Sequence, residues 1–346
     1  SSSGYTTQYQ NFGRTSNKGI EFNVDALIVN KKDFSLSASF NIGFNKNRVE
    51  KFKNGESNYK TYSSKWNGNS AAPFDDYIIR EGEAVGQMYG YITGGIYTFD
   101  DFDYIGTGTY PYRLKGDTDG SKTEAAASLI GAKYFGPGSL KLVDKDGNIA
   151  TSTDAKTVIG NANPDLIGGF NLTARYKGFD LSAFFNFSIG NDVYNANKID
   201  NSCYSGSRKY NNLVEEMKNR FTYIDPATGY LAYNDPVRLA EINKNATIWS
   251  PYMTTAVLHS WAVEDGSFLR FNNLTLGYTF PKRWVKKLGL TNLRIYGTVY
   301  NVCVITGYSG FDPEVSTRNS TAMTPGVDYS AYPKSRSFIG GVNVSF

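Results

Sequence analysis

The residues that could bind a metal ion in this chain of 346 residues lie in one short segment. Asp144, Asp146 and Asn148 alternate in VDKDGNI, which is the spacing with which a calcium loop presents oxygen ligands. Such a loop also ends in a bidentate acid, and none stands at the expected distance here. A plain turn is therefore the preferred interpretation, with a metal site at these three residues as the alternative.

Side chains that could carry out catalysis are not arranged for it. His259 is the only histidine, so a Ser/His/Asp triad would depend on this one imidazole and a His-based metal cluster cannot form. No spacing of acids nominates the pair of carboxylates that glycoside cleavage needs. We therefore expect neither an enzyme nor a bound cofactor.

Aromatic side chains are the better candidates for contact with a ligand. Trp249 and Tyr252 lie in NATIWSPYMTT, in the middle of a long segment without strand character, and are predicted to contact a substrate or partner. Trp66, in a polar loop, is predicted either to stack on a sugar or to join an aromatic belt at a membrane interface. Trp261 directly precedes a strand and is predicted to lie in such a belt.

The elements that position these residues are long strands with strictly alternating side chains. In FSLSASFNIGF the apolar residues occupy every second position from Phe34 to Phe44, a run of about 11 residues, which is the length that a tilted strand needs to cross a bilayer. The chain ends in GGVNVSF, where Val342, Val344 and Phe346 share one parity. We predict that these three face lipid, and a terminal strand that closes on Phe resembles the assembly signal of bacterial outer-membrane barrels.

The same pattern divides the chain into hairpins and long connections. Paired alternating segments cover residues 20–44, 77–97, 170–189 and 269–299, with short turns predicted at 30–33, 82–84, 177–178 and 281–291. Ile20 to Ile28 share one parity, and the parity change after Phe271 predicts a bulge near Asn272–Asn273. The segments without sustained alternation are all long: 50–75, 98–164, 191–264 and 306–334. Sorting long and short connections onto opposite ends is typical of outer-membrane barrels, whose long loops are extracellular.

Composition agrees with a transmembrane barrel and excludes other classes. Aromatic residues make up 15% of the chain, yet the mean hydropathy is −0.41 and no apolar run of about 20 residues exists, so a helical membrane protein is excluded. A net charge of +4, spread along the chain, gives no reason to expect nucleic acid. About nine strands are predicted, and single-chain bacterial barrels have an even number. We therefore expect residues 1–346 to be the C-terminal part of a larger barrel.

An ordered series of motifs resembles the C-terminal region of the SusC/RagA-like TonB-dependent outer-membrane transporters of Bacteroidota. The motifs are GRTSNKGIEFNV (13–24), FNIGFNKNRV (40–49), REGEAVGQMYGYITGGIYTFDD (80–101), KLVDKDGNI (141–149), VIGNANPDLIGGF (158–170), WAVEDGSFLRFNNLTLGYTFP (261–281), TNLRIYGTVYNVCVITGYSGFDPEV (291–315), GVDYSAYPKSRSF (326–338) and the terminal GVNVSF.

The resemblance implies a 22-stranded barrel with a plug domain that imports oligosaccharides or peptides through the outer membrane. It further implies a SusD-like surface lipoprotein as a lid, and TonB, ExbB and ExbD as the source of energy. The plug, the segment that contacts TonB and the earlier strands are expected to precede this chain. Two other readings stay open at this point: a passive porin or adhesin on the same barrel, and a soluble sugar-binding β-protein.

Overall fold

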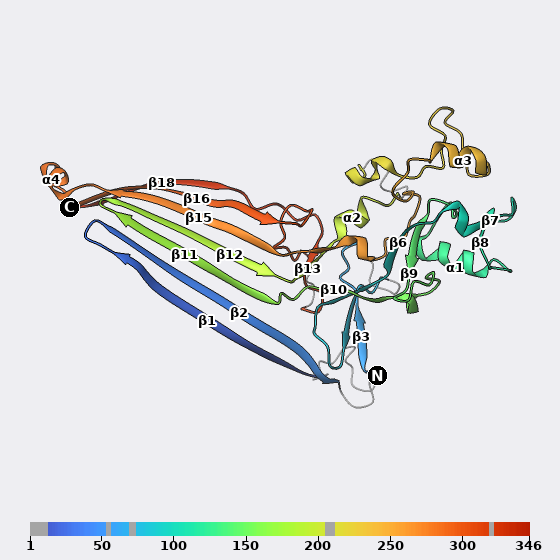
Figure 1. Cartoon of the computed structure of the whole chain (residues 1–346), viewed down its shortest axis with the longest axis horizontal. Helices are drawn as coiled ribbons and strands as arrows, with labels where there is room; N and C mark the ends of the chain where they lie inside the picture. The colour runs from blue at the N-terminus through green and yellow to red at the C-terminus, as the bar shows by residue number, and fades with distance from the viewer. Residues whose placement is uncertain (1–12, 53–56, 69–73, 205–211, 318–321) are drawn as a thin grey trace, which may run out of the picture.

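The computed structural model describes residues 13–52, 57–68, 74–204, 212–317 and 322–346. Its dominant element is one antiparallel sheet of seven long strands, and the long connections fold together at one end of that sheet (Figure 1). The strands pair in chain order: β1 (Gly13–Asn30), β2 (Phe34–Phe52), β11 (Leu166–Tyr176), β12 (Phe179–Ile189), β15 (Phe268–Thr279), β16 (Asn292–Thr306) and β18 (Ser337–Ser345).

The register of the sheet puts the alternating apolar residues of all strands on one side, which we call the apolar face. Phe40, Phe170, Phe185 and Phe271 are opposite one another on four successive strands. The Phe185 ring stacks on Phe170 at 4.4 Å and on Phe271 at 4.2 Å between ring centroids. The opposite side, the polar face, carries rows of small hydroxyl residues such as Thr275 and Thr298, whose hydroxyls are 2.8 Å apart. The sequence period of two is thus the period of the sheet.

The pairing of the large sheet shifts at three places, one of them between Arg14 and Thr15 at the loop end of β1, and the other two lie where the sequence parity changes. The pairing shifts between Phe271 and Asn273 on β15, so the bulge predicted near Asn272–Asn273 is confirmed. A second shift lies between Leu27 and Val29 on β1 and places Val29, rather than Ile28, opposite Leu36. Ile28 is the inserted residue and has no partner of its own, so the apolar parity that runs from Ile20 to Ala26 continues at Val29.

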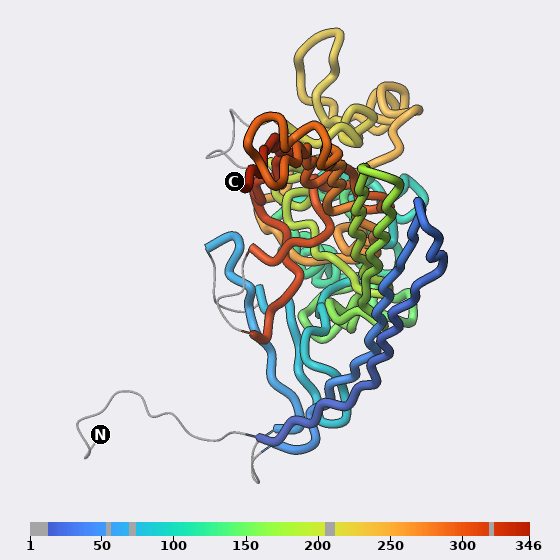
Figure 2. Tube along the Cα trace, turned by 90° about the vertical axis from the view of Figure 1, so that its left-hand side faces the viewer, coloured from blue at the N-terminus to red at the C-terminus, as the bar shows by residue number. Residues whose placement is uncertain are grey.

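Short and long connections separate to the two ends of the sheet. The turns at 30–33 and 177–178 and the segment 281–291 lie at one end with the C-terminus, and the last of these contains α4 (Lys282–Val285) (Figure 1). The other end carries the described parts of the four predicted long segments, which Figure 2 shows gathered behind the sheet. We call these two ends the turn end and the loop end.

The connections at the loop end form a folded unit, the loop region, with small sheets of its own. Its strands are β3 (Tyr59–Tyr62), β4 (Tyr77–Arg80), β5 (Gln87–Gly90), β6 (Ile92–Ile96), β7 (Phe102–Tyr104), β8 (Tyr112–Leu114), β9 (Leu140–Val143), β10 (Thr157–Asn161), β13 (Asp192–Asn195), β14 (Val263–Asp265) and β17 (Val327–Asp328). Its helices are α1 (Ser121–Ile130), α2 (Ala196–Asp200) and α3 (Pro236–Ile242). A continuous core of buried aromatic and aliphatic residues, drawn from segments between Trp66 and Val327, holds the unit together. No helix among the described residues is long and apolar enough to cross a membrane.

The structure corrects the predicted hairpin at 77–97 and, with it, the strand count. Tyr77, Ile78 and Ile79 are all buried, so β4 is covered on both sides and belongs to a small sheet of order β10-β5-β4-β3 in the loop region. The turn at 82–84 lies at the loop end, where Val49 of β2 donates a backbone hydrogen bond to Glu83. The large sheet therefore has seven strands within the described residues instead of about nine.

Candidate functional site

A pocket of about 730 Å³ lies between the polar face of the sheet and the loop region. The sheet contributes polar side chains, among them Glu21, Asn23 and Asn41 from the middle of β1 and β2 and Asn186 of β12, and the loop region contributes Asp192 and Glu314. Three carboxylates and several amides line the pocket, and none of its lining residues in the described ranges is Lys or Arg. Such groups accept and donate hydrogen bonds to hydroxyl or amide groups of a ligand.

Some polar groups of the pocket already form hydrogen bonds within the protein, and others do not. The Asp192 carboxylate accepts a hydrogen bond of 2.7 Å from the backbone of Asn161, and burial raises the pKa of this carboxyl. Among the described residues, Glu21, Asn23 and Asn41 have no side-chain hydrogen-bond partner, and they are exposed. These three residues were not singled out from the sequence. Their place on the polar parity of the hairpin 20–44, near its loop end, is the signal that could have found them.

A buried ion pair fixes the last loop beside this pocket. The Arg270 guanidinium, on the polar face of β15 and 2% exposed, donates to Asp312 at 2.5 Å and approaches Glu314 at 3.3 Å. Arg270 also donates to the side chain of Asn301, whose backbone is in the left-handed region with φ 51°. Lys334 pairs with the same Glu314. These contacts tie the segment 307–334 to two strands of the sheet, so the wall of the pocket is anchored.

A second ionic contact on the polar face lies near the turn end. Arg294 of β16 reaches across β15 and donates to both carboxylate oxygens of Asp180 on β12, at 2.9 and 2.5 Å. The crossing is possible because residue 277 is glycine: a Cβ there would lie 2.3 Å from the Arg294 guanidinium. The guanidinium also lies 4.9 Å from the centre of the Tyr296 ring. This clamp braces three strands on the polar face.

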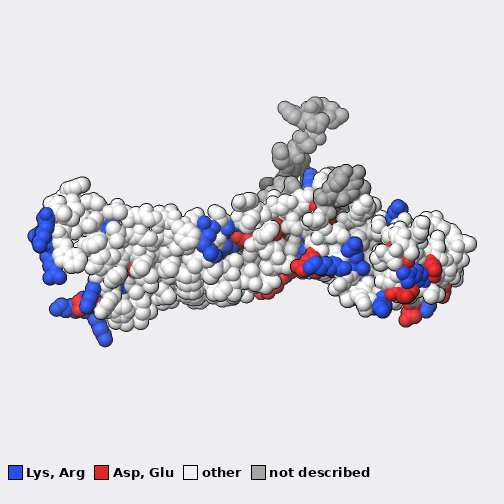
Figure 3. Space-filling view, turned by 90° about the horizontal axis from the view of Figure 1, so that it is seen from above, with Lys and Arg blue, Asp and Glu red and all other residues white. Residues whose placement is uncertain are grey.

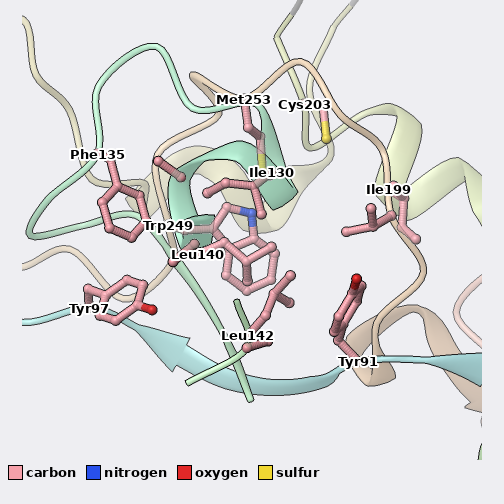
Figure 4. Packing of buried hydrophobic residues seen from close by; sticks show 14 of the residues in the cluster. Tyr91, Tyr97, Ile130, Phe135, Leu140, Leu142, Ile199, Cys203, Trp249 and Met253 are labelled. Atoms are coloured by element: carbon pink, nitrogen blue, oxygen red, sulfur yellow. The ribbon is translucent and has the colours of Figure 1, made fainter. Parts of the chain in front are cut away.

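The aromatic residues proposed as ligand contacts lie in the loop region, and two of them are buried. Trp249 is 3% exposed and packs edge-on against Trp261, with 4.9 Å between ring centroids, and against His259. Figure 4 shows Trp249 in the middle of the apolar core beside Ile130. Trp261 is partly buried and packs against this core, with Lys198 4.2 Å from its ring centre, so the prediction that it lies in a membrane-interface belt is wrong.

Trp66 and Tyr252 differ in exposure. Trp66 is 4% exposed, donates its indole N–H to the Tyr194 hydroxyl at 2.5 Å and packs on Tyr329. Protein atoms cover the rings of Trp66 and Trp249 in this structure, and the contact of these two residues with substrate stays a prediction. Tyr252 is half-buried in a group of tyrosines that includes Tyr134, and its contact with substrate stays a prediction.

Burial also shifts the proton affinity of several groups in the loop region. Asp76 is 5% exposed, and burial raises its pKa to about 7 although the backbone N–H and hydroxyl of Ser64 donate to it. Burial lowers the pKa of Lys156, which lies nearby, to about 8. Burial and the charge of Lys198 lower the pKa of His259 to about 3, so this imidazole is neutral at pH 7.

The segment around Asp144 forms a turn. One oxygen of its carboxylate accepts hydrogen bonds from the backbone N–H groups of Asp146, at 2.9 Å, and of Asn148, at 2.8 Å. These bonds lower the pKa of Asp144, with the Asn148 side chain as the largest contributor. No three metal-ligating side chains come together anywhere in the described ranges. The carboxylate oxygens of Asp144 thus accept hydrogen bonds from groups of the turn.

The apolar face has the features of a surface that meets a membrane. Val342 and Val344 of β18 lie opposite Ile295 and Leu293 on this face, and Phe346 follows at the C-terminus, 89% exposed. At the turn end, Phe179, Tyr278, Phe280 and Trp284 form a chain of ring contacts. Figure 3 shows Lys and Arg at the turn end, then a stretch of sheet almost without charge, then mixed charges over the loop region. Aromatic rings next to an uncharged band are typical of membrane barrels.

The chain is similar to curated proteins along nearly its whole length. TonB-dependent receptor P3 of Formosa agariphila is 31% identical over an alignment of 353 positions, which covers 99% of this chain and 30% of the relative. TonB-dependent receptor SusC of Bacteroides thetaiotaomicron is 25% identical, with 97% of this chain and 27% of SusC covered. The chain thus spans about 30% of the length of the relatives it matches. No protein-family model matches the sequence.

Solved structures show the same fold. The RagAB peptide importer in its open-open state superposes on the whole chain with a TM-score of 0.67 at 23% identity, and the chain covers 30% of that protein. The RagAB peptide transporter gives a TM-score of 0.66 at 22% identity. The similarities in sequence and the shared arrangement of strands agree with the apolar and polar faces described above. Over nearly its whole length the chain is thus similar to TonB-dependent receptors, SusC among them, and its seven long strands are arranged as in part of the antiparallel β-barrel of such transporters.

Proposed function

We propose that this chain is part of an energised importer in the outer membrane that takes up oligosaccharides or peptides. The single observation that carries the proposal is the division of the molecule: one sheet with an apolar face, and a folded loop region at only one of its ends. A sheet whose edges are closed by further strands satisfies its backbone groups in lipid, so the apolar face can meet the membrane. The loop region then faces the outside of the cell.

The partners follow from the relatives and are proposals for this protein. RagAB is a peptide importer, and SusC is a TonB-dependent receptor. By analogy, we propose a SusD-like surface lipoprotein as partner of the loop region. We further propose that TonB, ExbB and ExbD supply energy through parts of the protein that precede this chain.

Within this chain, we propose that substrate passes along the polar face and contacts the pocket at its loop end. Glu21, Asn23 and Asn41 have free polar groups for this contact, and Arg270 holds the opposite wall in place. Tyr252 is proposed as an aromatic contact from the loop region. These roles need binding and release only, and no catalytic step is proposed.

Uptake measured in cells with and without TonB tests the proposal. A full-length protein that imports its substrate only in cells with TonB supports an energised importer, and transport at the full rate without TonB would make it a diffusion pore. Tyr252→Ala should weaken uptake while the amount of folded barrel stays the same. Thr254→Ala, a nearby change in an exposed polar side chain, is the matched control. A protein that leaves the membrane fraction without detergent would instead be the soluble sugar-binding alternative.

A further inference from the structure

The loop-end part of the β1–β2 hairpin gathers basic residues on directly opposite positions. Lys18 pairs with Lys46, and Arg14 pairs with Lys51, across the antiparallel ladder. Arg48 lies opposite Ser16, between these two pairs. Directly opposite residues of an antiparallel pair point to the same side of the sheet, with their Cβ atoms about 4.5–5.5 Å apart. The register therefore brings like charges together on one surface.

This surface continues the apolar face. Ile20 and Phe44 form the next pair of the same parity after Lys18 and Lys46, and Phe22 follows opposite Ile42. All of these side chains except Ile42 are exposed. From the turn end to the loop end of the hairpin, this side of the sheet therefore changes from exposed apolar residues to exposed cations between two successive pairs on that side.

Strand length places this change at the edge of the membrane. β2 has 19 residues, whereas a tilted strand crosses the hydrocarbon layer with about 9–11. Eleven residues counted from Phe34, where the strand begins, end at Phe44. Lys46 and Arg48 come immediately after it, at the depth of the lipid headgroups.

Within the described part of the chain, the cations of this surface have no salt-bridge partner. Among the described residues, none of Lys18, Lys46, Arg48 and Arg14 forms a salt bridge. Among the described residues, Glu50 is the acid that lies between these cations: a hydrogen bond from Ser16 and the charges of Arg48, Arg14 and Lys18 lower its pKa. One carboxylate leaves a clear positive excess. Like charges directly opposite each other destabilise a sheet unless an anion lies between them.

We propose that the basic surface formed by Arg14, Lys18, Lys46 and Arg48 binds the phosphate groups of an anionic membrane lipid. Arginine can hold a phosphate with two hydrogen bonds and lysine acts as a compact charge beside it. The exposed apolar residues Ile20 and Phe44 supply the contact for the acyl chains. That contact favours a lipid over a free phosphate ion. The inference rests on the proposed function only for the orientation of the barrel, with the loop region outside the cell, which puts this lipid in the outer leaflet.

Binding of a phosphorylated lipid to the full-length protein tests the site. The protein is purified in mild detergent, and lipid binding is titrated by native mass spectrometry with diphosphoryl lipid A, with its dephosphorylated form and with inorganic phosphate. The double variant K18Q/K46Q should bind diphosphoryl lipid A about 25-fold more weakly than the parent, at about fivefold for each basic residue near a membrane surface. The matched control K115Q/K122Q removes two exposed lysines of the loop region and should bind as the parent does.

The outcomes separate the possibilities. Loss of affinity in K18Q/K46Q but not in the control, together with weak binding of the dephosphorylated lipid, supports the proposal. Equal binding by the parent and K18Q/K46Q overturns it, and so does inorganic phosphate that binds as tightly as the lipid. K18Q/K46Q should fold normally, because it removes a repulsive pair. The assay uses purified protein without an energy source, so a failure of TonB-dependent uptake would leave its result unaffected.

Discussion

Replacing Phe185 with arginine should destabilise the barrel far more than the same change at the neighbouring Phe184. Phe185 is the seventh of the 11 residues of β12, near the middle of the strand, and lies on the apolar face. Phe184 is at almost the same depth on the polar face, where its ring contacts Gly169. The two positions therefore share residue type and depth, and differ in the side of the sheet.

The expected cost follows from the contacts of each ring. An arginine that faces lipid near the bilayer midplane costs about 2–4 kcal/mol. Phe185→Arg also removes two stacked ring pairs, at 4.4 and 4.2 Å, worth about 0.5–1.5 kcal/mol each. The sum is about 3–7 kcal/mol. Phe184→Arg should cost about 1 kcal/mol or less, because the guanidinium can reach water on the polar face.

Urea titration of the full-length protein folded in lipid vesicles, followed by tryptophan fluorescence, measures both free energies of unfolding. Phe185→Leu separates the two parts of the effect, since it removes the ring pairs without adding a charge and should cost about 1–3 kcal/mol. A cost for Phe184→Arg equal to or larger than that for Phe185→Arg would refute the assignment of the two faces.

Three further predictions follow from the polar contacts. Gly277→Ala should displace the Arg294 guanidinium and lower the unfolding free energy by about 1–2 kcal/mol. In an Arg294→Gln background the same change should cost almost nothing, and additive costs of the two substitutions would contradict the clamp. Arg270→Gln leaves the carboxylate of Asp312 buried without its ion pair. Limited proteolysis should therefore cut the segment 307–334 faster while the barrel stays folded, and an unchanged cleavage rate would exclude the anchoring role of Arg270. Asp76 has a pKa of about 7 in the folded protein, above its ordinary value of 3.8, so the proton it binds stabilises the loop region fully at about pH 4 and this contribution is lost as the pH rises through 7. Asp76→Asn should therefore match the parent near pH 4 and exceed it in stability above pH 7, as thermal unfolding across this pH range would measure.

The sequence predicts the large sheet because its strands are long and bury only one side. From Phe34 to Phe44 the apolar residues occupy every second position, and the structure pairs them as this parity requires. The bulge near Asn272 could be predicted for the same reason, since the parity change is visible in the sequence. The bulge at Ile28 could not be predicted, because Leu27, Ile28 and Val29 are ordinary strand residues and nothing in the sequence marks the inserted one.

The loop region could be predicted from the sequence only as a set of long segments. Tyr77, Ile78 and Ile79 are consecutive apolar residues, which is the pattern of a strand that is covered on both sides. Because residues nearby alternate, the segment is predicted from the sequence as a hairpin with only one buried side. The burial of Trp249 depends on contacts with segments more than one hundred residues earlier in the chain, such as Ile130 and Leu142. Such packing sets which aromatic ring is open to a ligand, and local spacing does not reveal it.

The order of the strands has a consequence for how the protein assembles. The strands of the large sheet lie side by side in the order in which they occur in the chain, so the sheet can grow by one hairpin at a time. The core of the loop region draws on several of the connections between those hairpins, from Trp66 to Val327, and cannot be complete until the last of them is in place. The sheet is therefore expected to form before the core of the loop region is complete.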